Sequence, residues 1–384
     1  MAFLPFYLPF AKAPKFVIVG GGYAGMAALI SLYRHCPSAN VILIDPRLGH
    51  LKITHLHEQF RQTTAKLNIP FSILGQRFGF RHVCAKLEYN DELLRQWQSD
   101  RYLSLGDERI SFDYLLLALG AKIEKVQPSD FMFDFDDFSS GNFQAATERL
   151  SVMENRSEPI HVIGGGPTGI QFLFEIADWL RSRNMKNPLR LIDAFDNVLT
   201  RFKPSIVNYV RAKMVENQID FLPNNIFLGQ EDASVLLENR LSGEKTKHRS
   251  AMTFCFVGKR SSSVMETNPF GQVMLGRATL SRIFAAGDCA NYRSYGSNAP
   301  TAQTAVRKAK VCARNILRHS GKLQLMEPYI HQDLGYVISL GPHDAIGWVG
   351  LQANVVSGTP AAVVKKLVEA QHDLLLAGID TYLI

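Results

Sequence analysis

The stretch KFVIVGGGYAGMAALISLYRHCPSANVILID, residues 15–45, carries every part of a dinucleotide-binding βαβ unit in order. An apolar strand over residues 16–19 leads into a loop that matches G-x-G-x-x-G and then into a helix. The spaced glycines of that loop are Gly20, Gly22 and Gly25. A second strand, residues 41–44, ends at Asp45, which can accept hydrogen bonds from ribose hydroxyls. Because all these parts are in place, a glycine-rich turn without a ligand is the weaker interpretation.

Residues 159–193 repeat this pattern of strand, glycine loop, helix, strand and acidic end. The second set of motif residues is Gly164, Gly166, Gly169 and Asp193. Two such units predict two bound dinucleotides. No arginine follows Asp193 in residues 194–196, which favours an unphosphorylated ribose and therefore NADH over NADPH. Gly258 is also assigned to cofactor binding.

Two further segments belong with these loops. Residues 282–290, RIFAAGDCA, indicate a buried strand followed by Gly287 and Asp288 at the expected start of a helix. There the carboxylate could bind a ribityl hydroxyl, and the simpler alternative is a helix N-cap. Residues 112–120, FDYLLLALG, indicate a strand that leaves a nucleotide domain at Gly120.

Composition limits the class of protein. The chain has 384 residues, of which 46% are hydrophobic and 20% charged, so it is globular, with two or three compact units. A net charge of +7 suits anionic cofactors or lipid head groups, and no DNA- or RNA-binding motif is present, so nucleic acid is not expected. No apolar run is long enough to cross a bilayer, and residues 1–14 are interpreted as an extended arm rather than a signal peptide.

The five cysteines form no C-x-x-C pair, which argues against a disulfide framework, a zinc site or a vicinal redox disulfide. They are Cys36, Cys84, Cys255, Cys289 and Cys312. This usage favours a reducing, cytoplasmic location.

Together these motifs resemble the two-dinucleotide-binding flavoprotein superfamily that contains the pyridine nucleotide-disulfide reductases. The resemblance implies an α/β fold with two Rossmann-like domains, FAD at the first loop with Asp45, Gly120, Gly287 and Asp288, and NADH at the second. It also implies a discontinuous FAD domain with the NAD(H) domain inserted and a C-terminal interface or membrane-associated region. The corresponding boundaries are 1–125 and 270–326 for FAD, 126–269 for NAD(H), and 327–384 for the C-terminal region.

Within the superfamily, the electron acceptor distinguishes the members. Residues 49–64 lack the cysteine pair of the disulfide reductases, and no pair like that of the sulfide:quinone reductases is found. The remaining resemblance is to type II NADH dehydrogenases, since residues 299–305, APTAQTA, look like the start of their A-Q-x-A-x-Q motif. It implies hydride transfer from NADH to FAD and then reduction of a quinone. Gln303 would lie on the acceptor side, with a helix starting after it, and Gln171 and Glu175 would lie beside the nicotinamide.

Three departures keep other acceptors open. Gln171 replaces the family's glutamate, Arg307 replaces its second glutamine, and the chain ends at residue 384, short of the full tail. One alternative is an NADH-dependent reductase of a small redox protein such as ferredoxin or rubredoxin, with Lys308 and Lys310 beside Arg307 facing an acidic partner. The other is an FAD-containing redox sensor or scaffold.

The C-terminal region predicts an amphipathic helix that starts with Thr359 as its cap and ends at Gly378. Val363, Val364, Leu367, Val368, Leu374 and Leu375 are expected on one face, with Lys365, Lys366 and Glu369 on the other. This helix could lie on the cytoplasmic face of a membrane, close the base of its domain or form a homodimer seam.

A cluster of histidines, residues 50, 55 and 57, precedes Glu58 and could suggest a metal site. The run lacks the second histidine of H-E-x-x-H, so no metal is expected.

Overall fold

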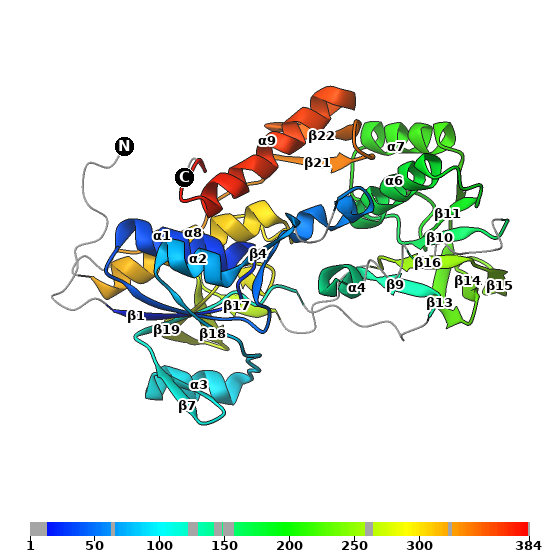
Figure 1. Cartoon of the computed structure of the whole chain (residues 1–384). Coiled ribbons are helices and arrows are strands. Elements are labelled where there is room, and N and C mark those ends of the chain that lie inside the picture. Colours follow the sequence, from blue (N-terminus) through cyan, green and yellow to red (C-terminus); the bar gives the residue numbers. More distant parts are fainter. Residues whose placement is uncertain are drawn as a thin grey trace.

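The computed structural model describes residues 14–62, 66–121, 130–141, 148, 157–257, 264–321 and 325–382. Figure 1 shows two sheet-based halves side by side, with the C-terminal helix α9 crossing above them. This is the predicted α/β class with two Rossmann-like sheets. Gly258 and residues 1–13 of the predicted arm lie outside the described residues.

The first sheet has eight strands in the order β20-β17-β18-β19-β8-β1-β2-β5. Their bounds are β1 Lys15–Val19, β2 Asn40–Ile44, β5 Arg81–Val83, β8 Tyr114–Leu117, β17 Met265–Thr267, β18 Gln272–Leu275, β19 Ala278–Ala285 and β20 Ala290–Tyr292. β1 pairs in parallel with β2 and β8, and β19 continues the parallel sheet beyond β8. One sheet therefore combines strands from the first third of the chain with strands that follow residue 264.

Helices cover both faces of this sheet, which is why its central strands are apolar on both sides. α1 (Tyr23–His35) packs against α8 (Ala302–Ser320) on one face, where α2 (Phe71–Phe78) also lies (Figure 1). α3 (Asp91–Asp100) lies on the other face, near the hairpin of β6 (Tyr102–Leu105) and β7 (Glu108–Ser111). The first ten residues of α1 are all buried, so this helix has no solvent face there.

The second sheet has five parallel strands in the order β12-β11-β10-β16-β9. Their bounds are β9 Met132–Asp134, β10 Ile160–Ile163, β11 Leu189–Ile192, β12 Ile219–Leu222 and β16 Met252–Cys255. The accompanying helices are α4 (Phe135–Ser140), α6 (Pro167–Ser182) and α7 (Pro204–Glu216). A three-stranded antiparallel sheet follows β12 and comprises β13 (Asn225–Glu231), β14 (Ser234–Asn239) and β15 (Lys245–Arg249).

Two smaller parts connect the halves. After β2, the ribbon of β3 (Gly49–Leu51) and β4 (Asn68–Pro70) encloses the 3-10 helix η1 (Ile53–Phe60), which packs on α6. Near the C-terminus, β21 (Gly335–Ser339), β22 (Ala345–Val349) and β23 (Leu351–Ser357) form an antiparallel sheet. α9 (Gly358–Leu376) follows it and contacts both this sheet and α1.

The structure corrects two predicted helix starts. Asp288 lies in a turn rather than at a helix start, because the residues after it form β20 and pair with β17. The next helix, α8, begins at Ala302, with the Thr301 hydroxyl accepting a hydrogen bond from the Thr304 amide at 3.1 Å. Thr359 is not the cap of α9, because that helix already begins at Gly358.

The predicted single apolar face of α9 is also wrong. Val364 and Val368 line a cavity, whereas Val363 and Leu367 are 50% and 64% exposed. Lys365 lies inward with the first pair rather than on a solvent face. Among the described helices, none combines the length and apolarity needed to cross a bilayer.

Candidate functional site

A cavity of about 1000 Å³ lies where the two halves meet. Its wall combines the first glycine loop, η1, the N-terminal parts of α6 and α8, β21 and β22, and the inner side of α9. Among the predicted site residues, the cavity is lined by Gly20, Gly22, Asp45, Gly120, Gly287, Asp288, Gln171 and Gln303. Residues far apart in the chain therefore share one space.

The first glycine loop lets the helix begin close to the strand and leaves its own backbone open to a phosphate group. A Cβ atom on Gly25 would lie 1.7 Å from the Gly20 carbonyl oxygen, so the helix can begin this close to the strand only with glycine. Gly20 has a φ of +104°, a backbone conformation that residues other than glycine rarely adopt. A Cβ on Gly22 would meet nothing within 4 Å, which leaves open space for a pyrophosphate over the amino end of α1.

Asp45 is held by backbone and side-chain donors at the end of β2. Its Oδ2 accepts from the Gly21 amide at 2.6 Å, and its two oxygens accept from the Arg47 guanidinium at 2.8 and 3.0 Å. Burial alone would raise the pKa of Asp45, but Arg47 and the amides outweigh it and lower the pKa. The carboxylate therefore stays charged beside the loop. Arg47 carried no motif signal in the sequence.

The second glycine loop repeats this geometry on the second sheet. Gly164 has a φ of +105°, a Cβ on Gly169 would lie 1.9 Å from the Gly164 oxygen, and Gly166 faces open space. Asp193 accepts hydrogen bonds from the Gly165 amide and, at 2.8 Å, from the Phe195 amide. These motif residues lie outside the cavity wall, but the helix that follows them, α6, presents Gln171 to it.

Glu175 does not join Gln171 at the cavity. It is 1% exposed and accepts from Arg61 Nε at 3.1 and 3.2 Å. Burial raises the pKa of Glu175 to about 7, and Arg61 opposes that rise. One turn of α6 is enough to direct Glu175 towards η1 instead of the cavity.

A polar cluster surrounds the end of Gln171. Lys365 Nζ donates to Gln171 Oε1 at 2.8 Å and to Ser339 Oγ at 2.9 Å, and lies 3.3 Å from His57 Nε2. Burial, and then Lys365, hold the pKa of His57 well below its usual value, so its ring is neutral and Nε2 can accept. Because Lys365 Nζ and the Ser339 hydroxyl both donate to Gln171 Oε1, the oxygen of this amide is fixed and its NH2 group is the donor available to a ligand.

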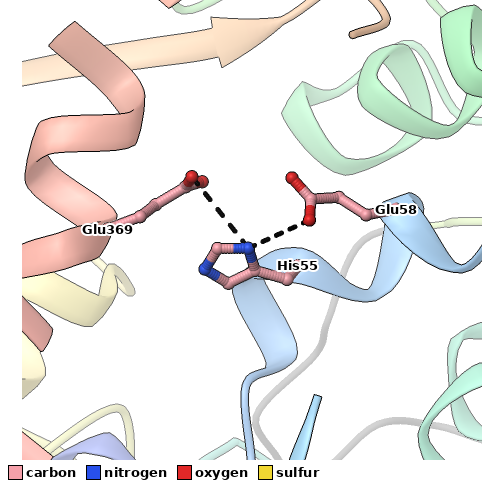
Figure 2. Close-up of side chains that lie close together, drawn as sticks. All are labelled: His55, Glu58 and Glu369. Atoms are coloured by element: carbon pink, nitrogen blue, oxygen red, sulfur yellow. Dashed lines mark hydrogen bonds and ion pairs between the residues drawn. The ribbon is translucent and has the colours of Figure 1, made fainter. Parts of the chain in front are cut away.

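Figure 2 shows a second polar cluster, made of His55 and Glu58 on η1 and Glu369 on α9. His55 Nδ1 lies 3.3 Å from Glu58 Oε2 and 4.0 Å from Glu369 Oε2. The other carboxylate oxygens face cations, with Arg61 2.8 Å from Glu58 Oε1 and Lys365 3.4 Å from Glu369 Oε1. A metal ion could reach all three groups, whose ligand atoms lie within 4.8 Å of one another. Because the two cations already balance the carboxylates, the prediction of no metal is kept.

The inner side of α9 also contacts the first glycine loop. His372 Nε2 lies 3.0 Å from His50 Nε2, and His50 Nδ1 lies 2.9 Å from the Gly21 oxygen. The Tyr23 ring stacks on His372 with ring centroids 4.1 Å apart. Sequence analysis missed this contact, as it missed the roles of Lys365 and Glu369, because no local motif marks residues of α9 that face a cavity.

The cysteines near the first sheet are packing residues in this structure. Cys289 and Cys312 are buried, and burial raises their pKa values to about 11 and about 12. Cys312 Sγ lies 2.9 Å from the Tyr292 hydroxyl. Thiols that resist ionisation are poor nucleophiles, so these two cysteines are unsuited to a thiolate relay.

Comparisons with known proteins agree with this architecture. Type II NADH:quinone oxidoreductase of Staphylococcus aureus is 24% identical over 403 residues, covering 95% of this chain and 96% of that protein. NDH2 of Plasmodium falciparum, solved in complex with NADH, has a TM-score of 0.76 at 16% identity, with 94% of each chain covered. The sulfide:quinone oxidoreductase of Aquifex aeolicus has a TM-score of 0.74 at 18% identity, covering 96% of this chain and 92% of that one.

The pattern of the pyridine nucleotide-disulphide oxidoreductases matches residues 14–309. This match contains both glycine loops and every strand of the two large sheets. The resemblance stated from the motifs is thereby confirmed, and the chain belongs to the pyridine nucleotide-disulphide oxidoreductase family.

Proposed function

We propose that the chain is an FAD-dependent NADH dehydrogenase that reduces a quinone. The observation that carries this proposal is the shared cavity, in which the first glycine loop, Gln171 on α6 and Gln303 on α8 face one space. The full-length relatedness to a type II NADH:quinone oxidoreductase supports the choice of reaction. We also propose that residues 1–125 and 270–326 form the FAD domain, residues 126–269 the NAD(H) domain, and residues 327–384 the C-terminal region.

The residues at the first loop fit a flavin dinucleotide. Gly22 leaves space for the pyrophosphate, Asp45 offers carboxylate oxygens to a ribose, and Asp288 lies on the same cavity wall, where a ribityl chain would run. A bound flavin would accept a hydride from NADH and pass electrons onward. The protein would position the reactants: Asp193 holds the NADH ribose, Gln171 directs its amide donor at the ligand, and Gln303 contacts the acceptor.

This proposal is tested by adding NADH without oxygen to the purified holoprotein. The flavin absorbance should bleach and then return when a quinone is added. A flavin band that stays unchanged would refute hydride transfer, and a reduced flavin that no quinone reoxidises would favour the sensor alternative. Parallel turnover with ubiquinone, menaquinone, ferricyanide and oxygen identifies the acceptor class.

Reduction of an acidic redox protein is less well supported, because the basic residues assigned to that partner are not available at the surface. Lys308 is 1% exposed and donates to the Ala290 oxygen at 2.7 Å, and Lys310 forms an ion pair with Asp380 at 2.8 Å. Arg307 lines the cavity. Turnover that falls steeply with salt would revive this alternative.

We also propose that α9 attaches the protein to the cytoplasmic face of a membrane. The alternative is that the same exposed side of α9 forms the interface of a homodimer. Val363, Leu367 and Leu374 are its exposed apolar residues. We expect Val363→Ser with Leu367→Ser to reduce flotation with anionic liposomes, while Leu228→Ser, an exposed residue on β13, should not. A change of oligomeric state instead would indicate the seam.

A further inference from the structure

Reduction of a quinone by NADH requires a proton source, because NADH, quinone and one proton give NAD⁺ and quinol. We propose that His55 and Glu369 form a proton relay that recharges Lys365 at the cavity wall, and that Lys365 donates this proton to the quinone oxygen. The inference rests on the proposed function. It assigns a role to the cluster in Figure 2, which neither the glycine motifs nor the flavin site accounts for.

The inner end of the relay is the Lys365 ammonium. Its Nζ lies 2.8 Å from Gln171 Oε1, 2.9 Å from Ser339 Oγ and 3.3 Å from His57 Nε2, and donation to a quinone oxygen in the cavity would replace the longest of these contacts. Burial lowers the pKa of Lys365 and Glu369 opposes that change, which makes proton loss easier than from a solvated lysine. Gln171 cannot ionise, and buried His57 is kept neutral, so Lys365 is the cationic acid in this cluster.

The outer end is His55, which lies between the two glutamates (Figure 2). His55 faces Glu58 from η1 and Glu369 from α9, and His57 lies close by. Arg61, the residue after η1, pairs with Glu58, and Lys365 pairs with Glu369. The Arg61 side chain is one-third exposed, so the cluster reaches solvent there. The 4.0 Å gap between His55 and Glu369 is short enough for a rotation of the flexible glutamate or a single water to bridge.

Each step conserves atoms and charge. The quinone receives two electrons and one hydrogen that came from NADH, and its second O–H bond forms as an Nζ–H bond of Lys365 breaks. A hydronium ion at the solvent side then protonates His55 and leaves water, His55 passes that proton to the Glu369 carboxylate, and Glu369 passes it to the neutral amine of Lys365. Side chains of the cavity wall must carry the proton because NADH and quinone displace water from the cavity while they react.

The test compares two acceptors in the holoprotein, because ferricyanide takes electrons without protons and quinone takes both. The variants are His55→Gln and Glu369→Gln. Their matched controls are His343→Gln and Glu92→Gln, both exposed and away from the cavity. We expect the ratio of quinone turnover to ferricyanide turnover to fall at least about tenfold in the two variants and to stay constant in the controls. Flavin content and melting temperature are measured for each.

Two further readouts separate proton transfer from a structural role. The slowed variants should show a larger solvent deuterium isotope effect on quinone reduction, and added imidazole should restore turnover of His55→Ala. An unchanged ratio, or equal losses with both acceptors, would overturn the relay while leaving quinone reduction standing. If the wild-type protein bleaches with NADH but reduces no quinone, the proposed function itself fails and the relay with it.

Discussion

The two glycine loops have nearly the same backbone but different surroundings. Both first glycines have φ values near +105°, and a Cβ on either third glycine would overlap the first glycine's oxygen. The first loop faces a cavity walled by α9, and its Asp45 is buried and paired with Arg47. The second loop lies outside that cavity wall, and its Asp193 is half-buried and accepts hydrogen bonds from the backbone amides of Gly165 and Phe195. We therefore predict that the first loop retains its cofactor and that the second loop exchanges its own.

The largest expected effect comes from adding one methyl group to each glycine loop. Gly25→Ala places Cβ 1.7 Å from the Gly20 oxygen and should yield protein that loses its flavin, at least about tenfold in flavin content. Gly169→Ala, with a 1.9 Å overlap, should keep the flavin and lose bleaching by NADH.

Gly229→Ala, where nothing lies within 4 Å, is the control for both glycine variants. Flavin content and stopped-flow absorbance measure the outcomes. Equal loss of flavin in the two loop variants would contradict the assignment of different cofactors.

The helices after the loops differ in charge, which predicts a pH dependence. Glu175 lies on α6, six residues after the third glycine of its loop. The equivalent position on α1, six residues after Gly25, is the buried Ser31. Burial raises the pKa of Glu175 from 4.5 to about 7, so between these pH values the folded state holds a proton that the unfolded state has lost. Stability should therefore fall by about 1–3 kcal/mol as pH rises through this window.

Glu175→Gln should reduce this fall, as urea unfolding at pH 5 and pH 8 would measure. The Ser31→Ala variant should keep the wild-type slope. If the slope is the same in Glu175→Gln, another group is responsible for the pH dependence.

The acidic residues at the two strand ends should control different ligands. Asp193→Ser removes the carboxylate that would repel a 2′-phosphate, and we expect kcat/KM for NADPH relative to NADH to rise about tenfold. Asp45→Ser should leave that ratio unchanged and weaken flavin retention instead. A shift of nucleotide preference in the Asp45 variant would reverse the assignment of the two loops.

The smallest expected effect concerns metals. Dialysis of the holoprotein against EDTA should leave both turnover rates unchanged, because Arg61 and Lys365 already balance the glutamates around His55. Activity lost to EDTA and recovered with a divalent ion would show a metal at this cluster.

Local signals explain why sequence analysis located the glycine loops and their flanking strands to within about a residue. Strand, tight turn and helix start are fixed there by neighbouring residues and by the sterics of Gly20 and Gly25. The failures depend on distant pairing: β17 draws the residues after Asp288 into a strand. The inward position of Lys365 is set by contacts with His57 and Gln171, which lie 308 and 194 residues away in the chain.

The contact between His50 and His372 also has a consequence for how the protein is made. These residues are 322 positions apart, and His50 bonds to the loop that would hold the flavin. On the ribosome, the first glycine loop emerges long before the helix that walls it. Because the first sheet also needs the strands after residue 264, the flavin pocket can be completed only when nearly the whole chain has been made, with the wall formed by α9 added last.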